Sequence, residues 1–226
     1  MPATVLLASA PLLWMHAREM MSQELYDYFI FIPIGAAFLA WQRLPGLGQL
    51  VPGNALVFAA LMAVGGGTLA FAVAIFSPWF AMIAALIVTL GMLYGVGGGR
   101  VLARMLPVWL FLWFMVPLPF DLGETLVTSL QSVTAVWSSR LLDTFGIMHL
   151  MTGNTVELPG NHLFVDEACS GVHSLFACVA ATAFFVIWSR YRLVRSLLLL
   201  AAAFGWVLVD NAMRVVLITW CTTLNI

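Results

Sequence analysis

Continuous apolar segments, rather than an alternation of apolar and polar residues, dominate the pattern along this chain. A membrane-spanning helix needs about 20 apolar residues, whereas the strands of a membrane barrel alternate with a period of two. We therefore predict an all-α fold, a polytopic transmembrane helix bundle of about seven spans. The predicted helices cover about Ala3–Trp14, Leu25–Trp41, Ala55–Phe76, Trp79–Val96, Met105–Leu118, Ala168–Trp188 and Leu197–Trp220.

The first of these segments is only about half a span long. No basic residues precede it, as they would in a signal peptide, so we interpret it as a short or truncated first helix. The breaks between the later helices contain Gly and Pro, including Leu44-Pro45-Gly46 and Gly97-Gly98-Gly99. We expect residues 1–226 to form a single integral membrane domain.

A different pattern follows the fifth predicted helix. Between Asp121 and Gly146, apolar residues recur at helical spacing, which predicts an amphipathic helix at the membrane interface. The residues at those positions are Leu122, Leu126, Leu130, Val133, Trp137, Leu141 and Leu142, and the polar residues between them are Glu124, Gln131, Ser138, Arg140 and Asp143. The turn pairs Gly153-Asn154 and Pro159-Gly160 then predict a hairpin-like loop. Together these segments form the expected extracytoplasmic element, about 119–165.

The composition supports a membrane protein and excludes several functions. Charged residues make up 8% of the chain, against roughly 25% in soluble domains. The chain has no lysine and no basic tract, so nucleic acid is not an expected partner. The three cysteines, Cys169, Cys178 and Cys221, show no C-x-x-C spacing, so we predict no metal site and no cofactor.

The arginines predict the orientation in the membrane. Six of them lie in connections on one side of the predicted bundle: Arg43, Arg100, Arg104, Arg190, Arg192 and Arg195. The other side holds most of the acidic residues but only Arg18 and Arg140. Because basic residues are retained in cytoplasmic loops, the arginine-rich side is expected to be cytoplasmic.

Polar residues within the predicted spans cluster on the last two helices. One opens with the run from Asp166 to Ser174, and the other contains Asp210-Asn211-Ala212-Met213-Arg214. Cys169 precedes Arg190 by 21 residues, and Arg214 follows Arg195 by 19. At 1.5 Å per residue these separations are about 31 and about 29 Å. Since a short basic turn joins the two antiparallel helices, Cys169 and Arg214 are expected at matching depth near the outer face.

A cysteine beside a fixed guanidinium has a chemical use. The thiolate is the nucleophile and a nearby cation favours it, while an arginine can also stabilise an oxyanion. His173 lies four residues after Cys169, on the same helix face, and is a candidate general acid or base. Glu167, Ser170 and Asn211 are candidate supporting or substrate-binding residues.

Structural interpretations stand beside these. Cys178 and Cys221 are expected to be structural. Arg214 could be the ion-pair partner of Asp210, which would not exclude catalysis, and His173 could be a packing residue. Asp166 and Glu167 could simply begin a helix, where negative charge suits the dipole. His149 and His162, in the outer loop, are expected to be solvated.

At these residues the sequence resembles the exosortase/archaeosortase family of membrane cysteine transpeptidases. The resemblance rests on Glu167-Ala168-Cys169-Ser170-Gly171 followed by Ser174-Leu175, and on Asn211-x-x-Arg214 about forty residues later. Supporting features are Val116-Pro117-Leu118-Pro119, the Gly153-Asn154 to Pro159-Gly160 loop, and the Tyr28–Trp41 helix followed by Arg43. The resemblance covers most of the chain, from about Tyr28 onward.

The resemblance implies a function and a location. Such enzymes, in the cytoplasmic membrane of prokaryotes, cleave C-terminal sorting signals of exported proteins at its outer face and transfer the product to an acceptor lipid or glycan. The partners implied are exported proteins whose signal contains a short motif, a transmembrane helix and a basic cluster, together with membrane lipids. Cys169 would form a thioester and Arg214 would stabilise the thiolate or the oxyanion.

The family usually has a third catalytic basic residue in a further helix, whereas this chain ends twelve residues after Arg214. A missing last helix, a fragment, or substitution by His173 would each account for this difference.

Two other functions compete with transfer. An intramembrane cysteine protease would use the same acyl-enzyme but release it to water. A scaffold or a transporter would not be an enzyme at all. A transporter is expected to show polar residues near the midplane of several helices, and the second to fourth predicted helices show almost none.

Overall fold

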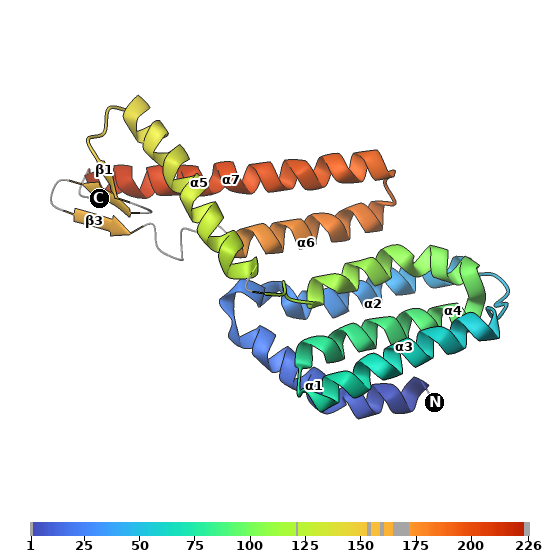
Figure 1. The fold of residues 1–226 in the computed structure, drawn as a ribbon. Coiled ribbons are helices and arrows are strands. Elements are labelled where there is room, and N and C mark those ends of the chain that lie inside the picture. Colours follow the sequence, from blue (N-terminus) through green and yellow to red (C-terminus); the bar gives the residue numbers. More distant parts are fainter. Residues whose placement is uncertain (1, 121, 153–154, 159–160, 165–171, 224–226) are drawn as a thin grey trace. The chain divides into compact units, whose positions relative to one another are not determined.

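The structure is a computed structural model that describes residues 2–120, 122–152, 155–158, 161–164 and 172–223. Most of the described chain is helical (Figure 1). The helices group into two compact units. The first unit contains residues 1–117 and 183–191, and the second contains residues 118–182 and 192–226.

The first unit is built from four α-helices, three short 3₁₀ segments and the end of a fifth α-helix among the described residues. Asn54 caps one of these helices by accepting a hydrogen bond from the Leu56 amide at 2.8 Å. The elements are α1 (Pro2–Ser22), η1 (Glu24–Ile30), α2 (Phe31–Arg43), η2 (Leu44–Gly46), α3 (Ala55–Ala74), α4 (Pro78–Phe111), η3 (Leu112–Met115) and the end of α6 (Val172–Ser189).

Helix α1 is longer than predicted. The sequence placed its end near Trp14, but it continues to Ser22. No Gly or Pro interrupts residues 15–22, so the backbone can stay helical beyond the apolar segment. Within that extension His16 is buried, and its Nε2 lies 2.9 Å from the carbonyl oxygen of Met115.

Helix α4 folds back on itself at Gly97 and Gly98 (Figure 1). Gly98 has φ +60° and ψ −157°, a conformation essentially restricted to glycine. Trp109 Nε1 donates to the carbonyl oxygen of Leu86 at 2.9 Å. Those residues would be about 35 Å apart in a straight helix. The break predicted after Val96 is therefore confirmed, and α4 consists of two antiparallel limbs.

Three polar side chains hold the end of the second α4 limb. His16 contacts the Met115 carbonyl, and Tyr28 Oη donates to the Phe114 carbonyl at 3.5 Å. Trp79 Nε1 donates to the Pro117 carbonyl at 2.9 Å. These contacts satisfy carbonyls that a helix end and a following Pro-rich segment leave without backbone donors.

The second unit contains α5 (Leu122–Thr144), three strands, the beginning of α6 and helix α7 (Leu193–Thr223). The hairpin-like loop expected here is a three-stranded antiparallel sheet of order β1-β2-β3. Its strands are β1 (Leu150–Thr152), β2 (Thr155–Leu158) and β3 (Asn161–Phe164), and Glu157 pairs with both Leu150 and His162. Each of the two predicted turn pairs falls between two strands. The segment therefore forms two consecutive hairpins, where one hairpin-like loop was expected.

Helix α5 packs against α7, with Leu142 fully buried against Val215 and Val216. The predicted amphipathic helix is present, but its buried face differs from the expected one. Ser138, predicted on the polar face, is fully buried, whereas Trp137 is 42% exposed. The stripe that faces α7 includes Leu130, Thr134, Ser138 and Leu142, which recur every four residues and so lie on one side of the helix.

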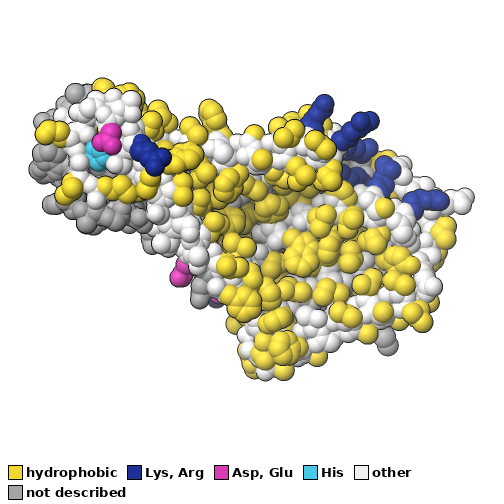
Figure 2. All heavy atoms as spheres, turned by 45° about the horizontal axis from the view of Figure 1, so that its top comes forward, with side chains coloured by type: hydrophobic (Ala, Val, Ile, Leu, Met, Phe, Trp, Pro, Cys, Tyr) yellow, Lys and Arg dark blue, Asp and Glu magenta, His cyan; other side chains and the backbone are white. Residues whose placement is uncertain are grey.

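Four helical segments of the described chain are long and apolar enough to cross a membrane: Tyr26–Gly46, Ala55–Ala74, Pro78–Met115 and Leu193–Cys221. The expected count of about seven spans is not confirmed. Hydrophobic side chains cover much of the surface in view (Figure 2). Large ones such as Leu56 and Trp206 are 77% and 70% exposed, as lipid-facing residues are in a multi-pass membrane protein.

Candidate functional site

The structure describes part of the predicted site. Glu167, Cys169 and Ser170 lie outside the described residues. His173 belongs to the first turn of α6, and its side chain also lies outside the described part. The predicted approach of Cys169 to Arg214 therefore stays a prediction. Asn211 and Arg214 are described, and both lie on α7.

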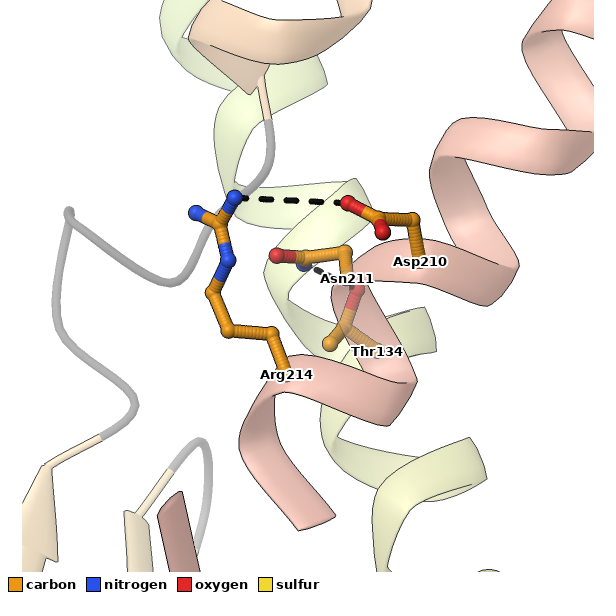
Figure 3. A network of polar contacts seen from close by, with 4 residues as sticks. All are labelled: Thr134, Asp210, Asn211 and Arg214. Carbon is orange, nitrogen blue, oxygen red and sulfur yellow. Dashed lines mark hydrogen bonds and ion pairs between the residues drawn. The ribbon is translucent and has the colours of Figure 1, made fainter. Parts of the chain in front are cut away.

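Helix α7 directs the polar residues of this motif to two faces (Figure 3). Asn211 is 3% exposed and faces α5. The side chains of Arg214 and Asp210 are 45% and 59% exposed. Because these two residues are one helical turn apart, they lie on one face, where Met213 and Leu217 are also exposed. A guanidinium on such an apolar face is costly in lipid, and this cost favours a functional role.

Asn211 anchors the motif to α5 through one hydrogen bond. Its Nδ2 donates to Thr134 Oγ1 at 2.9 Å, and both residues are buried. A second hydrogen bond reaches the next residue of α7: Ser138 Oγ, on α5, donates to the carbonyl oxygen of Ala212 at 3.3 Å. The two bonds fix the turn of α7 that precedes Arg214. Asn211 Oδ1 is also buried, and it has no hydrogen-bond partner among the described residues.

Arg214 and Asp210 form a loose ion pair. Arg214 Nη2 lies 4.0 Å from Asp210 Oδ2, and Figure 3 shows the two side chains directed toward each other. The pairing of Arg214 with Asp210, considered above as an alternative that does not exclude catalysis, is thus present in the structure. An exposed pair at this distance contributes little stability. The guanidinium, with its five N–H donors, can consequently turn toward a negative charge that develops nearby.

Sequence reasoning did not identify Thr134. A signal for it was present, because Thr134 and Ser138 lie four residues apart in line with Leu130 and Leu142. Small hydroxyl residues in such a stripe pack closely and can form hydrogen bonds to a neighbouring helix.

Sequence reasoning also expected His149 to be solvated. It is instead half-buried, with Nε2 2.8 Å from Ser139 Oγ and Nδ1 2.9 Å from the Ile147 carbonyl.

Replacing Thr134 by valine is expected to destabilise the second unit by about 1 kcal/mol, because it leaves the buried Asn211 amide without its acceptor. The measurement is the free energy of unfolding of the detergent-solubilised protein. Thr128→Val is the matched control, since Thr128 Oγ1 donates only to the Glu124 carbonyl of its own helix. Equal effects of the two substitutions would show that the Thr134–Asn211 contact does not hold the helices together.

The described part of the site can bind an anionic group and accept one hydrogen bond. Arg214 supplies the donors, and Asn211 Oδ1 supplies a buried acceptor one turn away. Among the described residues, no three His, Cys, Asp or Glu side chains gather where they could hold a metal ion. The predicted absence of a metal stays a prediction for the whole chain.

Comparison with known proteins identifies the family. A family model described as "Transmembrane exosortase" matches residues 14–225. Neither the search of curated proteins nor that of solved structures found a match. Exosortases as a family are membrane cysteine transpeptidases that act on exported proteins carrying sorting signals. The match covers nearly the whole chain and includes both the cysteine motif and Asn211-x-x-Arg214. This chain therefore belongs to the transmembrane exosortase family.

Proposed function

We propose that this exosortase cleaves C-terminal sorting signals at the outer face of the cytoplasmic membrane through a thioester on Cys169. The Cys169 sulfur attacks the carbonyl carbon of the scissile peptide bond, and Arg214 stabilises the oxyanion that forms. The C–N bond then breaks, and the amine leaves with a proton donated by His173. A nucleophilic group of an acceptor lipid or glycan then attacks the thioester carbonyl and passes its proton to His173, and the Cys169 thiolate leaves.

The observation that carries this proposal is the arrangement around Arg214. Its guanidinium is half-exposed on a turn that Asn211 and Thr134 hold against α5, and its one ion-pair partner among the described residues is Asp210, at 4.0 Å. A guanidinium on a backbone turn that is already held in place suits oxyanion stabilisation, which requires donors positioned before the reaction. The motif that contains it is the second of the two that relate the chain to the exosortases.

The supporting residues have roles that follow from their chemistry. Asn211, buried against α5 through its bond to Thr134, would position the turn that carries Arg214. Glu167 and Ser170 flank Cys169 and would shape its surroundings. The six arginines at the opposite ends of the spans support an outward-facing Cys169, by the positive-inside rule.

The test is co-expression of this chain with an exported protein that carries a C-terminal sorting signal, followed by mass spectrometry of the new C-terminus. We expect cleavage near the motif and an adduct on the acyl carbon. A free carboxylate would indicate hydrolysis and would contradict transfer. The control is the same exported protein with its short motif scrambled. Equal cleavage of both substrates, or of neither, would contradict recognition of a sorting signal.

A further inference from the structure

Three arginines of the first unit gather at the end of α2, and no carboxylate among the described residues pairs with them. Arg43 is 5% exposed, and its charged neighbours are Arg104 and Arg190. The described part of this unit contains no ion pair. Its described acidic side chains, Glu19 and Asp27, precede α2, whereas Arg43 ends it. In the described part of the chain, the positive charge at this end is therefore not balanced by a carboxylate.

The hydrogen bonds of Arg43 leave part of its guanidinium unsatisfied. Nη2 donates to the carbonyl oxygen of Ile187 at 2.8 Å, but Nη1 is buried without a partner among the described residues. Arg104 Nε donates to the Arg43 carbonyl at 3.0 Å, which brings a second guanidinium to the same turn. A buried charged donor without an acceptor is unfavourable, and so are neighbouring like charges. An anion beside Arg104 and Arg190 would offset the repulsion between the like charges.

An apolar cavity of about 580 Å³ lies between α2 and the two limbs of α4. It extends along α2 from Pro33 to Leu44, which is about 16 Å at 1.5 Å per residue. That length is about half of the roughly 30 Å hydrocarbon thickness, the depth of a single leaflet. Two lining side chains carry a polar group, and both groups are already bonded. The Thr89 hydroxyl donates to carbonyls of its own helix, and the Trp109 indole donates to the Leu86 carbonyl.

The charged cluster and the cavity meet at the turn η2. Leu44 and Leu47, at either end of this turn, line the cavity. Between them, Gly46 lies directly against the Arg104 guanidinium, which a Cβ on residue 46 would overlap. A side chain at residue 46 would therefore displace the Arg104 guanidinium from its place over the turn. An apolar groove that ends at cationic side chains is complementary to a phospholipid, in which an acyl chain lies below a phosphate.

We propose that this end of the first unit binds one anionic phospholipid, with its phosphate at Arg104 and Arg190 and one acyl chain in the cavity between α2 and α4. Basic pockets between transmembrane helices on the cytoplasmic side are typical sites for anionic headgroups. The predicted orientation places these arginines on that side. An apolar helix of another protein would fill the groove but would bring no anion to Arg104 and Arg190. The site involves only residues of the first unit and does not depend on the proposed transfer reaction.

The test is retention of phosphatidylglycerol over phosphatidylcholine by the full chain, reconstituted in vesicles of the two lipids, re-extracted in mild detergent and analysed by native mass spectrometry. We expect the wild type to retain one phosphatidylglycerol. Arg104→Gln is expected to reduce this preference about fivefold, the factor for roughly 1 kcal/mol per basic residue. Arg100→Gln is the matched control, because Arg100 is exposed near the same fold-back and is not among the charged neighbours of Arg43.

The acyl chain is tested separately. Ala37 lines the cavity, so Ala37→Phe should displace the lipid, whereas Ala59→Phe on the exposed face of α3 should not. Gel filtration checks that every variant is folded and monodisperse. Three results would overturn the proposal: equal losses for Arg104→Gln and Arg100→Gln, full retention by Ala37→Phe, or displacement of the lipid by an equal concentration of inorganic phosphate. The last result would indicate a phosphate site that does not use the groove.

Discussion

Processing of a co-expressed sorting-signal protein is expected to disappear when Cys169 is replaced by alanine. Without the sulfur no thioester can form, and removal of the nucleophile from a covalent catalyst costs roughly a million-fold in turnover. The measurement is the ratio of processed to full-length substrate in membranes, with the amount of exosortase quantified in the same samples. The variant should accumulate at the wild-type level, because one small side chain replaces another.

The chain contains its own matched controls. Cys178 is half-buried on α6, and Cys221 is exposed on α7. Cys178→Ala and Cys221→Ala remove the same thiol group without touching the motif, and both should retain processing. Normal processing by Cys169→Ala would rule out the acyl-enzyme. Loss of processing in all three variants would indicate a general requirement for thiols instead of a nucleophile at residue 169.

Replacing Arg214 by glutamine is expected to lower turnover by roughly 10²- to 10³-fold, the cost of removing one oxyanion donor. Substrate binding should change much less, because the charge is needed chiefly in the transition state. Arg214→Lys should recover only part of the activity, since an ammonium group cannot present the planar, forked donors of a guanidinium. The measurement is the initial rate of signal cleavage at several substrate levels.

Asp210→Asn separates this role from a structural one. It breaks the 4.0 Å pair with Arg214 but leaves the guanidinium in place. Because an exposed ion pair contributes about 0–1 kcal/mol, the rate should stay within about fivefold of the wild type. A second readout is the pH dependence of Cys169 alkylation in a Cys178→Ala, Cys221→Ala background. Arg214→Gln should shift its midpoint to higher pH, and an unchanged midpoint would place Arg214 away from the sulfur.

The apolar segments of the sequence predicted most helices well because burial in lipid imposes one requirement, a continuous apolar run with internal backbone hydrogen bonds. The break after Val96 was predictable from Gly97-Gly98-Gly99. The end of α1 was not, since His16 is held by the Met115 carbonyl, about a hundred residues away in the sequence. The three strands were missed as separate elements because each has only three or four residues.

The candidate site was predictable where the chemistry is unusual for a membrane. Asn211 and Arg214 stand out because polar residues are rare in apolar spans. Thr134 was not identified because its partner lies 77 residues away and its helix was expected to bury only apolar side chains. Periodicity identifies which residues share a face, but it does not say which face meets another helix. The face of α5 that meets α7 is set by close packing of the two helices through small residues.

The fold-back at Gly98 has a consequence for biogenesis. The limb that follows it, Gly99 to Phe111, is shorter than a full span and begins with Arg100 and Arg104. Because a full span needs about 20 apolar residues, this shorter limb has little tendency to leave the translocon alone. Its partner limb, Pro78 to Val96, carries no charged residue, and its Leu86 carbonyl accepts the hydrogen bond of the Trp109 indole. The two limbs are therefore expected to enter the bilayer together, as one helical hairpin released in a single step.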